Sequence, residues 1–409
     1  MKRVLAITLD GILQPIAYSQ VVRVAAGLAA TGIPYAIASL ERARDLADEA
    51  HVARVRAVLD AASIPWQAGV FQEGGGGRAI ATNLARITSA AHTLARREPI
   101  SVMHARAITG GLAARTLHTL LGKPYLFDAR AYWVDEQVEE GRRFTTPRAF
   151  RTAKAIEREI FSRAAGVVTL TTLQADDVRE GKLGPHRGRP VETIPTCADY
   201  DEFRIAPPGA PRPEPLARFA ADAPVLAIVG ALNRSYFARE SVELAARALA
   251  RAPSLRLVVL SAQQKEYAAL LDEVGIPRER ALVTSVPHDR MPEWTAHLTW
   301  AVLLLRSPFA KRASMPTKLA ELFASGVRPL EHGCNSEVSG WVERAGSGLV
   351  LPGVEPAHLD AAAHFVARTC AEPREAQRPL LERARELTAP HFSLASGIAR
   401  YRTILRAIM

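Results

Sequence analysis

Short apolar segments alternate with amphipathic helical patterns along most of the chain, and this alternation is the feature that most restricts its fold. Such alternation is typical of parallel sheets covered by helices on both faces. It occurs twice, from residue 3 to 195 and again from 225, and the two parts are separated by a proline-rich stretch at 207–215. This stretch can extend neither a helix nor a sheet. We therefore predict an α/β protein with two Rossmann-like domains.

The predicted strands are 3–8, 34–39, 65–70, 102–105, 125–129, 166–171 and 191–195 in the first half and 225–230, 255–260, 281–283, 301–305 and 348–351 in the second. A chain of 409 residues also exceeds the usual size of one hydrophobic core. We place the first domain at 1–203, a linker at 204–222 and the second domain at 223–390. The last predicted helix, 395–409, repeats apolar residues at helical spacing and must bury one face.

The charge of the chain favours anionic partners. Lys and Arg number 52 against 42 Asp and Glu, which gives a net charge of +10. Nucleotide diphosphates, nucleic acid and acidic lipid surfaces all fit such a charge. The three cysteines form no C-x-x-C pair, and the N-terminal apolar stretch is short and broken by Asp10. We therefore expect a cytoplasmic protein with no signal peptide and no membrane span.

The run from Ser314 to Gly326 is the most informative motif. It follows an apolar segment, so it lies where a parallel strand leads into a helix. Pro316 suits the first turn of that helix, whose free N–H groups and dipole favour phosphate binding. Lys318 adds a positive charge, and Glu321, about one turn later, can accept hydrogen bonds from a ribose diol. The run predicts a nucleotide-diphosphate site, with an amphipathic helix carrying a surface Lys–Glu ion pair as the alternative.

This run resembles the donor-site signature of retaining glycosyltransferases of the GT-B fold, family 4, which reads Pro-x-Lys-x-x-Glu-x-x-Ala-x-Gly. The resemblance implies two Rossmann-like domains facing across a cleft, with a terminal helix at 391–409 that crosses back to the first domain. It also implies a nucleotide-sugar donor, no bound metal and no cofactor. The donor-binding residues that it implies are Gly230, Asn233, Arg234, Ser314, Met315, Pro316, Thr317, Lys318 and Glu321.

Two positions depart from the family pattern. The family commonly has an arginine after the glycine that corresponds to Gly230, and a lysine a few residues later. Ala231 and, at about the second position, Tyr236 stand there in this chain, so we expect Arg234, with or without Arg239, as the substitute cation. The first glutamate of the family's Glu-x7-Glu pair falls on Ala313, which leaves that carboxylate missing.

The residues that follow the strand ending Ser101-Val102-Met103 carry the expected contact to the donor sugar. The family has two histidines here, separated by one residue, whereas this chain has His104 and Arg106. The resemblance implies that one of the two takes the role, and a histidine packed under a loop is the alternative. With Lys318 and Arg234, which would stabilise the leaving diphosphate, they form the predicted catalytic set.

The expected acceptor contacts come from two other segments. The run 127–136 resembles a loop of a bacterial subgroup of the family and contributes Asp128, Arg130 and Glu136. Ser19 and Gln20 would sit at the mouth of the helix at 18–31. The alternative for the run 127–136 is an interdomain salt-bridge cluster with aromatic core residues.

We therefore predict a retaining, metal-independent transferase that moves a hexose-type sugar from a nucleotide diphosphate to a glycan, lipid-linked or small-molecule acceptor. The basic stretch 142–158 either docks on an acidic membrane surface or forms a solvated helix face. No nucleic-acid partner is expected. A GT-B sugar-nucleotide epimerase and a catalytically inactive nucleotide-binding partner are the alternatives. A nicotinamide dehydrogenase would need Gly-x-Gly-x-x-Gly after a strand, which neither half contains.

Overall fold

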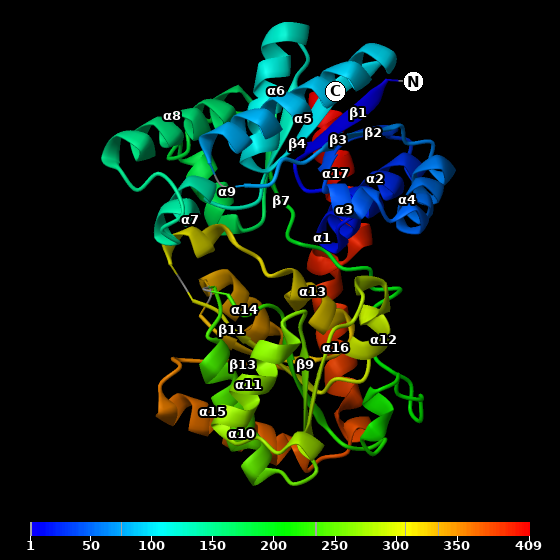
Figure 1. Cartoon of the computed structure of the whole chain (residues 1–409), viewed down its shortest axis with the longest axis vertical. Helices are drawn as coiled ribbons and strands as arrows, with labels where there is room; N and C mark the ends of the chain where they lie inside the picture. Colours follow the sequence, from blue (N-terminus) through cyan, green and yellow to red (C-terminus); the bar gives the residue numbers. More distant parts are fainter. Residues whose placement is uncertain (1, 75, 234, 307, 334) are drawn as a thin grey trace. The chain divides into compact units, whose positions relative to one another are not determined.

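The computed structural model describes residues 2–74, 76–233, 235–306, 308–333 and 335–409. The chain divides into two compact units (Figure 1). Unit 1 comprises Met1–Thr196, Phe309–Ser314 and Leu394–Met409, and unit 2 comprises Cys197–Pro308 and Met315–Ser393. Each unit contains its own parallel sheet, which confirms the predicted fold class.

Unit 1 contains a seven-stranded parallel sheet in the order β3-β2-β1-β4-β5-β6-β7. The strands are β1 (Arg3–Thr8), β2 (Tyr35–Glu41), β3 (Trp66–Val70), β4 (Ile100–Arg106), β5 (Tyr125–Ala129), β6 (Gly166–Thr169) and β7 (Val191–Thr193). Strand β2 is buried at every position, because helices cover both faces of the sheet. The register places Arg106 beside Asp128 on adjacent strands, which brings these residues to one sheet edge.

Helices connect the strands of unit 1, and two segments from late in the chain belong to the same unit. They are α1 (Pro15–Ala17), the π-helix η1 (Tyr18–Val22), α2 (Arg23–Ala30), α3 (Ala43–Leu46), α4 (Glu49–Ala61), α5 (Gly77–Arg97), α6 (Ala107–Leu121), α7 (Trp133–Glu139), α8 (Pro147–Arg163), α9 (Thr172–Arg179), the 3₁₀ turn η5 (Phe309–Ala313) and α17 (Leu394–Ile408). The terminal helix α17, red in Figure 1, packs against α2, where Ile398 lies close to Gly27.

Unit 2 contains a six-stranded parallel sheet in the order β10-β9-β8-β11-β12-β13. Its strands are β8 (Val225–Val229), β9 (Arg256–Leu260), β10 (Ala281–Thr284), β11 (Trp300–Leu304), β12 (Arg328–His332) and β13 (Leu349–Leu351). Its helices are α10 (Ala238–Arg251), α11 (Gln264–Val274), α12 (Met291–Thr295), α13 (Thr317–Ala324), α14 (Ser336–Ala345), α15 (Pro356–Cys370) and α16 (Arg374–Phe392), with 3₁₀ turns η2 (Leu216–Arg218), η3 (Arg278–Arg280) and η4 (His288–Arg290).

The unit bounds differ from the sequence-based domain bounds, since the predicted linker 204–222 and residues 391–393 belong to unit 2 and two further segments are exchanged. Residues 197–203 belong to unit 2, because the Ala198 N–H donates to the Phe392 carbonyl at 2.9 Å and Tyr200 Oη lies 3.1 Å from Thr388 Oγ1. Residues 309–314 belong to unit 1, because Ala310 and Ala313 are buried in its core. Both exchanges depend on contacts with residues that are distant in the sequence.

The start and the form of the first helical stretch were not predicted. The first helical stretch begins at Pro15, three residues before the predicted start, and its second turn is a π-helix. Ser19 and Gln20 therefore lie inside that stretch and not at its mouth.

Within the described ranges, no helix is long and apolar enough to cross a membrane.

Candidate active site

The sequence-predicted donor residues of unit 2 meet at the carboxyl edge of its sheet. Strand β8 ends at Val229, and Gly230 follows with φ +131°, a conformation that side chains other than glycine rarely adopt. Lys318, in the first turn of α13, donates from Nζ to the Val229 carbonyl oxygen and, at 3.3 Å, to Tyr236 Oη. A Cβ on residue 230 would collide with Lys318 Nζ. Because Gly230 has no side chain, the Lys318 ammonium can occupy this space.

Glu321 lies one turn further along α13 and is 7% exposed. Burial raises its pKa to about 7, although the nearby Lys318 opposes the shift. In the part of the chain that the structure describes, no group donates a hydrogen bond to this carboxylate. A buried carboxylate with unused acceptor capacity is a suitable partner for the hydroxyl groups of a ligand.

Two helices begin near this edge without a side-chain cap. Helix α13 starts after Pro316, and α10 starts after Phe237; neither residue caps its helix through a side-chain hydrogen bond. The first-turn N–H groups of a helix need acceptors, and the helix dipole makes them attract anions. With Lys318, they give this edge of the sheet the donors and the charge that a diphosphate requires.

Tyr236 is a member of this group that the sequence analysis assigned no role. Lys318 Nζ lies 4.9 Å from the centre of its ring, and Tyr236 is bridged to Leu305, just after β11. The aromatic ring occupies the position where the family pattern has a second cation. It supports Lys318 through a cation–π contact instead.

The remaining expected donor residues lie in varied surroundings. Asn233 is exposed, and its Oδ1 accepts from the Ser235 N–H at 2.9 Å. Arg234, expected as a phosphate-binding and catalytic cation, lies outside the described residues. Its expected companion Arg239 instead contacts Glu273 on α11, because both residues are exposed on neighbouring helices.

The residues just before α13 divide between the two units. Met315 is 3% exposed, and Pro316 and Thr317 are half-buried at the start of α13. Ser314 belongs to unit 1, where its N–H donates to the Lys311 carbonyl at 2.9 Å. Ala313, at the position of the family's first glutamate, is fully buried in the unit 1 core.

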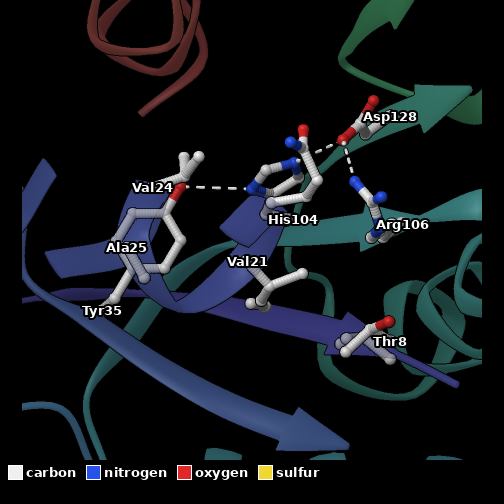
Figure 2. A pocket seen from close by; sticks show the side chains of 11 residues that line it. Thr8, Val21, Val24, Ala25, Tyr35, His104, Arg106 and Asp128 are labelled. Atoms are coloured by element: carbon white, nitrogen blue, oxygen red, sulfur yellow. Dashed lines mark hydrogen bonds and ion pairs between the residues drawn. The ribbon is translucent and has the colours of Figure 1, made fainter. Parts of the chain in front are cut away.

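In unit 1, the expected sugar-contacting residues form a buried polar cluster (Figure 2). His104 and Arg106 lie at the end of β4, and Asp128 lies beside them on β5. Nε2 of His104 is 3.5 Å from Asp128 Oδ2, and Nη1 of Arg106 is 3.6 Å from the same oxygen. On the other side of the imidazole, Tyr35 Oη lies 3.2 Å from Nδ1.

Asp128 is the centre of this cluster and is 1% exposed. Arg130 contacts its Oδ1 at 3.3 Å, and Tyr401 from α17 donates to its Oδ2 at 3.0 Å. Burial alone would raise the pKa of Asp128, but Arg130, His104 and Arg106 together hold it well below its usual value. Asp128 is therefore an anion that organises its neighbours.

A small cavity adjoins the cluster, with a free volume of about 10 Å³. Its lining includes Thr8, Gln20, Val21, His104 and Arg106. This volume is enough for about one water molecule and far too small for a sugar. Gln20 lies in the π-helix and is 8% exposed, while the neighbouring Ser19 donates from Oγ to the Ile16 carbonyl at 3.0 Å.

Glu136 and Tyr132 of the run 127–136 pack against the late segment 309–314. Glu136 forms an ion pair with Lys311 at 2.9 Å. The rings of Tyr132 and Phe309 stack with centroids 5.2 Å apart, and Tyr132 also donates a hydrogen bond to Asp177. These contacts lie within unit 1, and both the acceptor role of this run and its interdomain salt-bridge alternative stay predictions.

Glu41 is a second residue that the sequence analysis did not find. It is fully buried at the end of β2 and accepts from the N–H groups of Ile12 at 2.8 Å and Leu13 at 3.2 Å. Ser39 Oγ donates to it at 2.5 Å. Glu41 thereby fixes the loop after β1, although only its position at a strand end could have indicated this role.

No group of three or more His, Cys, Asp and Glu residues within the described ranges is arranged to hold a metal ion. Of the two cysteines that the structure describes, Cys197 and Cys370, neither forms a disulfide.

Comparisons with known proteins agree with this architecture. Residues 19–196 match the model of the glycosyl transferase 4-like domain. The whole chain is similar to sucrose-phosphate synthase from Thermosynechococcus elongatus, with 15% identity, a TM-score of 0.71 and coverage of 99% of this chain and 98% of that one. The chain has the GT-B fold, and its residues 19–196 are similar to the glycosyl transferase 4-like domain.

Two further solved structures share the fold. Anabaena HepE in complex with UDP-glucose is 12% identical, with a TM-score of 0.69 and full coverage of both chains. Trehalose 6-phosphate synthase from Burkholderia multivorans is 13% identical, with a TM-score of 0.68 and coverage of 100% of this chain and 99% of that one. A comparison with curated protein sequences finds no match.

Proposed function

We propose that the protein is a retaining glycosyltransferase that takes a hexose-type sugar from a nucleoside-diphosphate donor bound to unit 2. The observation that carries this proposal is the arrangement of Lys318, Gly230 and Glu321 at one sheet edge. Lys318 is bonded to the neutral oxygens of Val229 and Tyr236, so its charge has no anionic hydrogen-bond partner in the described structure. A diphosphate would supply that anion, and Glu321 would accept from the ribose hydroxyl groups.

The proposed mechanism uses the same groups. As the bond between the sugar and the diphosphate lengthens, negative charge increases on the diphosphate oxygens. Lys318 and the first-turn N–H groups of α13 would stabilise that charge, because they are fixed in place before the reaction. The acceptor hydroxyl attacks from the face on which the diphosphate leaves and transfers its proton to the departing phosphate oxygen. This sequence needs no metal and no protein base.

Solved structures of the same fold support the donor class. HepE has been solved in complex with UDP and with UDP-glucose. We propose a nucleotide sugar of this class as the donor, and a glycan, a lipid-linked sugar or a small molecule as the acceptor. The epimerase alternative predicts conversion of the donor without an acceptor. The inactive-partner alternative, which the buried Ala313 favours, predicts binding without turnover.

A binding experiment tests the donor site directly. UDP, GDP, ADP and dTDP are titrated into the wild-type protein and into Lys318→Ala by isothermal calorimetry. Lys123→Ala is the matched control, because this lysine lies before β5 in unit 1, at the opposite end of the strand from Asp128. We expect at least one nucleotide to bind wild type and Lys123→Ala equally and Lys318→Ala at least about tenfold more weakly. Equal binding by all three proteins would refute the proposed donor site.

We also propose that α8 contacts an anionic membrane surface. Arg148, Arg151 and Arg158 are exposed on this helix, and Ile156 of the same helix is 41% exposed. Exposed cations with an apolar side chain suit the headgroup region of acidic lipids. Sedimentation with vesicles of phosphatidylglycerol or of phosphatidylcholine tests this contact. Binding only to the anionic vesicles, lost when the three arginines become glutamine, is expected; equal binding to both lipids would contradict it.

A further inference from the structure

Arg306 lies at the same edge of the unit 2 sheet as Lys318 and was not among the predicted site residues. It follows Leu305 directly after β11, is exposed, and donates its main-chain N–H to the Ser235 carbonyl at 2.9 Å. Its guanidinium carbon lies 4.3 Å from the centre of the Phe237 ring. Across the described ranges, no carboxylate forms an ion pair with Arg306.

Phe237 is held firmly in this position. Its N–H donates to the Leu304 carbonyl at 3.0 Å, and its ring packs edge-on against His332 of β12 with centroids 5.8 Å apart. The preceding residue, Tyr236, lies under Lys318. Two consecutive aromatic residues therefore support two cations, which reduces the number of conformations in which each charge can move.

Lys318, Arg306 and the start of α10 place positive charge at one edge of the unit 2 sheet, where the described structure pairs neither side chain with a carboxylate. Besides Lys318 and Arg306, this edge of the sheet carries the start of α10. Its N-cap residue, Phe237, makes no side-chain capping hydrogen bond. The dipole of this helix of 14 residues adds to the positive potential at its start. Lys318 contacts neutral oxygens, and Arg306 contacts an aromatic face. Such a group of donors is suited to an anion with several oxygens.

We propose that Arg306 is the second phosphate-binding cation of the donor site and, with Lys318, holds the diphosphate of the nucleotide sugar. This inference rests on the function proposed above. It explains how the site can work with Ala231 at the position where the family has an arginine, since the replacement cation comes from the end of β11. The planar guanidinium can donate two hydrogen bonds to one phosphate group, whereas Lys318 acts as a point charge.

The test compares Arg306→Gln with wild type, using the nucleoside diphosphate that binds best and its parent nucleoside. Glutamine keeps a planar polar group that can still pack on Phe237, but it lacks the charge. Arg368→Gln is the matched control, because Arg368 is an exposed arginine 5.8 Å from the Phe365 ring on α15 of the same unit. Calorimetry is performed at two salt concentrations, and thermal unfolding checks that each variant is folded.

We expect Arg306→Gln to bind the diphosphate about tenfold more weakly, to bind the nucleoside unchanged and to show a weaker dependence of affinity on salt. Arg306→Lys should regain part of the affinity, and Arg368→Gln should equal wild type. If Arg306→Gln binds the diphosphate like wild type while Lys318→Ala does not, the inference is wrong and the proposed donor site stands. If Lys318→Ala also binds normally, or if no nucleotide binds wild type, the proposed donor site and the inference both fail.

Discussion

Tyr401, near the end of the chain, donates a hydrogen bond of 3.0 Å to Asp128 in the middle of the first sheet. The ring of Tyr401 also lies 5.3 Å from that of His104, which contacts the same carboxylate. Side chains from β4 and α17 contact Oδ2 of Asp128, and Arg130 contacts its Oδ1. The terminal helix is therefore a structural part of the polar cluster of unit 1.

Replacing Tyr401 by phenylalanine should destabilise the protein by about 1–3 kcal/mol, because a buried carboxylate loses a hydrogen bond while its charge remains. Urea unfolding measures this change. Tyr200→Phe is the control, since its buried hydroxyl contacts the neutral Thr388 Oγ1 at 3.1 Å and its removal should cost about 1 kcal/mol. A smaller loss for Tyr401→Phe than for Tyr200→Phe would contradict the central role of Asp128.

Glu321 should make nucleotide affinity depend on pH. Its pKa is raised to about 7, whereas hydrogen bonds from ribose hydroxyl groups favour the ionised form. Affinity should therefore increase as the pH rises from 6 to 8, by up to about tenfold. The matched variant Glu321→Gln should lose this dependence. Calorimetry across the pH range gives the answer, and an identical pH profile in both proteins would exclude Glu321 from the site.

The same pKa has a consequence for stability in the absence of nucleotide. A carboxyl group with a raised pKa binds more protons in the folded state than in the unfolded state. The unfolding free energy should therefore fall as the pH rises from the usual glutamate range to about 7, by up to about 3 kcal/mol. Urea unfolding at pH 5 and pH 8 tests this. Glu321→Gln should show a smaller decrease; an equal decrease would assign the effect to other groups.

Gly230→Ala should weaken nucleotide binding in addition to destabilising the protein, because it displaces Lys318. The substitution places a Cβ in the path of Lys318 and forces alanine into φ +131°. The backbone strain should cost about 1–3 kcal/mol. Gly275→Ala is the control, because Gly275 also has positive φ, at +83°, but a Cβ there would meet no heavy atom within 4 Å beyond its chain neighbours. Loss of nucleotide binding in Gly275→Ala to the same extent would show that strain, and not the position of Lys318, is responsible.

Glu41→Gln should destabilise the loop after β1. Three groups donate to the buried carboxylate, and an amide in its place turns an N–H₂ group toward N–H donors. We expect a loss of about 1–3 kcal/mol in urea unfolding, with faster hydrogen exchange at Ile12 and Leu13. The exposed Glu49 in α4 provides the control variant Glu49→Gln, which should change neither quantity. Unchanged exchange in Glu41→Gln would rule out this function of the carboxylate.

The periodic patterns predicted the two sheets, because such a pattern depends only on residues that are close in the sequence. The strands 3–8 and 125–129 have the predicted bounds, since alternation of apolar strands and helices directly reflects burial along a parallel sheet. The π-helix at Tyr18–Val22 and the shift of 309–314 into unit 1 had no such local signal. The placement of 309–314 arises from the burial of Ala310 and Ala313 among residues distant in the sequence.

The sequence alone determined the two α/β domains, the run from Ser314 to Gly326 and the resemblance to a glycosyltransferase family, because each depends on the order of neighbouring residues. Only the tertiary structure decided that Glu321 is buried without a donor among the described residues, that Tyr236 and Phe237 support Lys318 and Arg306, and that Asp128 is enclosed by cations and Tyr401. The physical reason is that the burial, the charge pairing and the pKa of a side chain depend on contacts with segments that are distant in the sequence. Strand order and helix packing determine which of these segments come into contact.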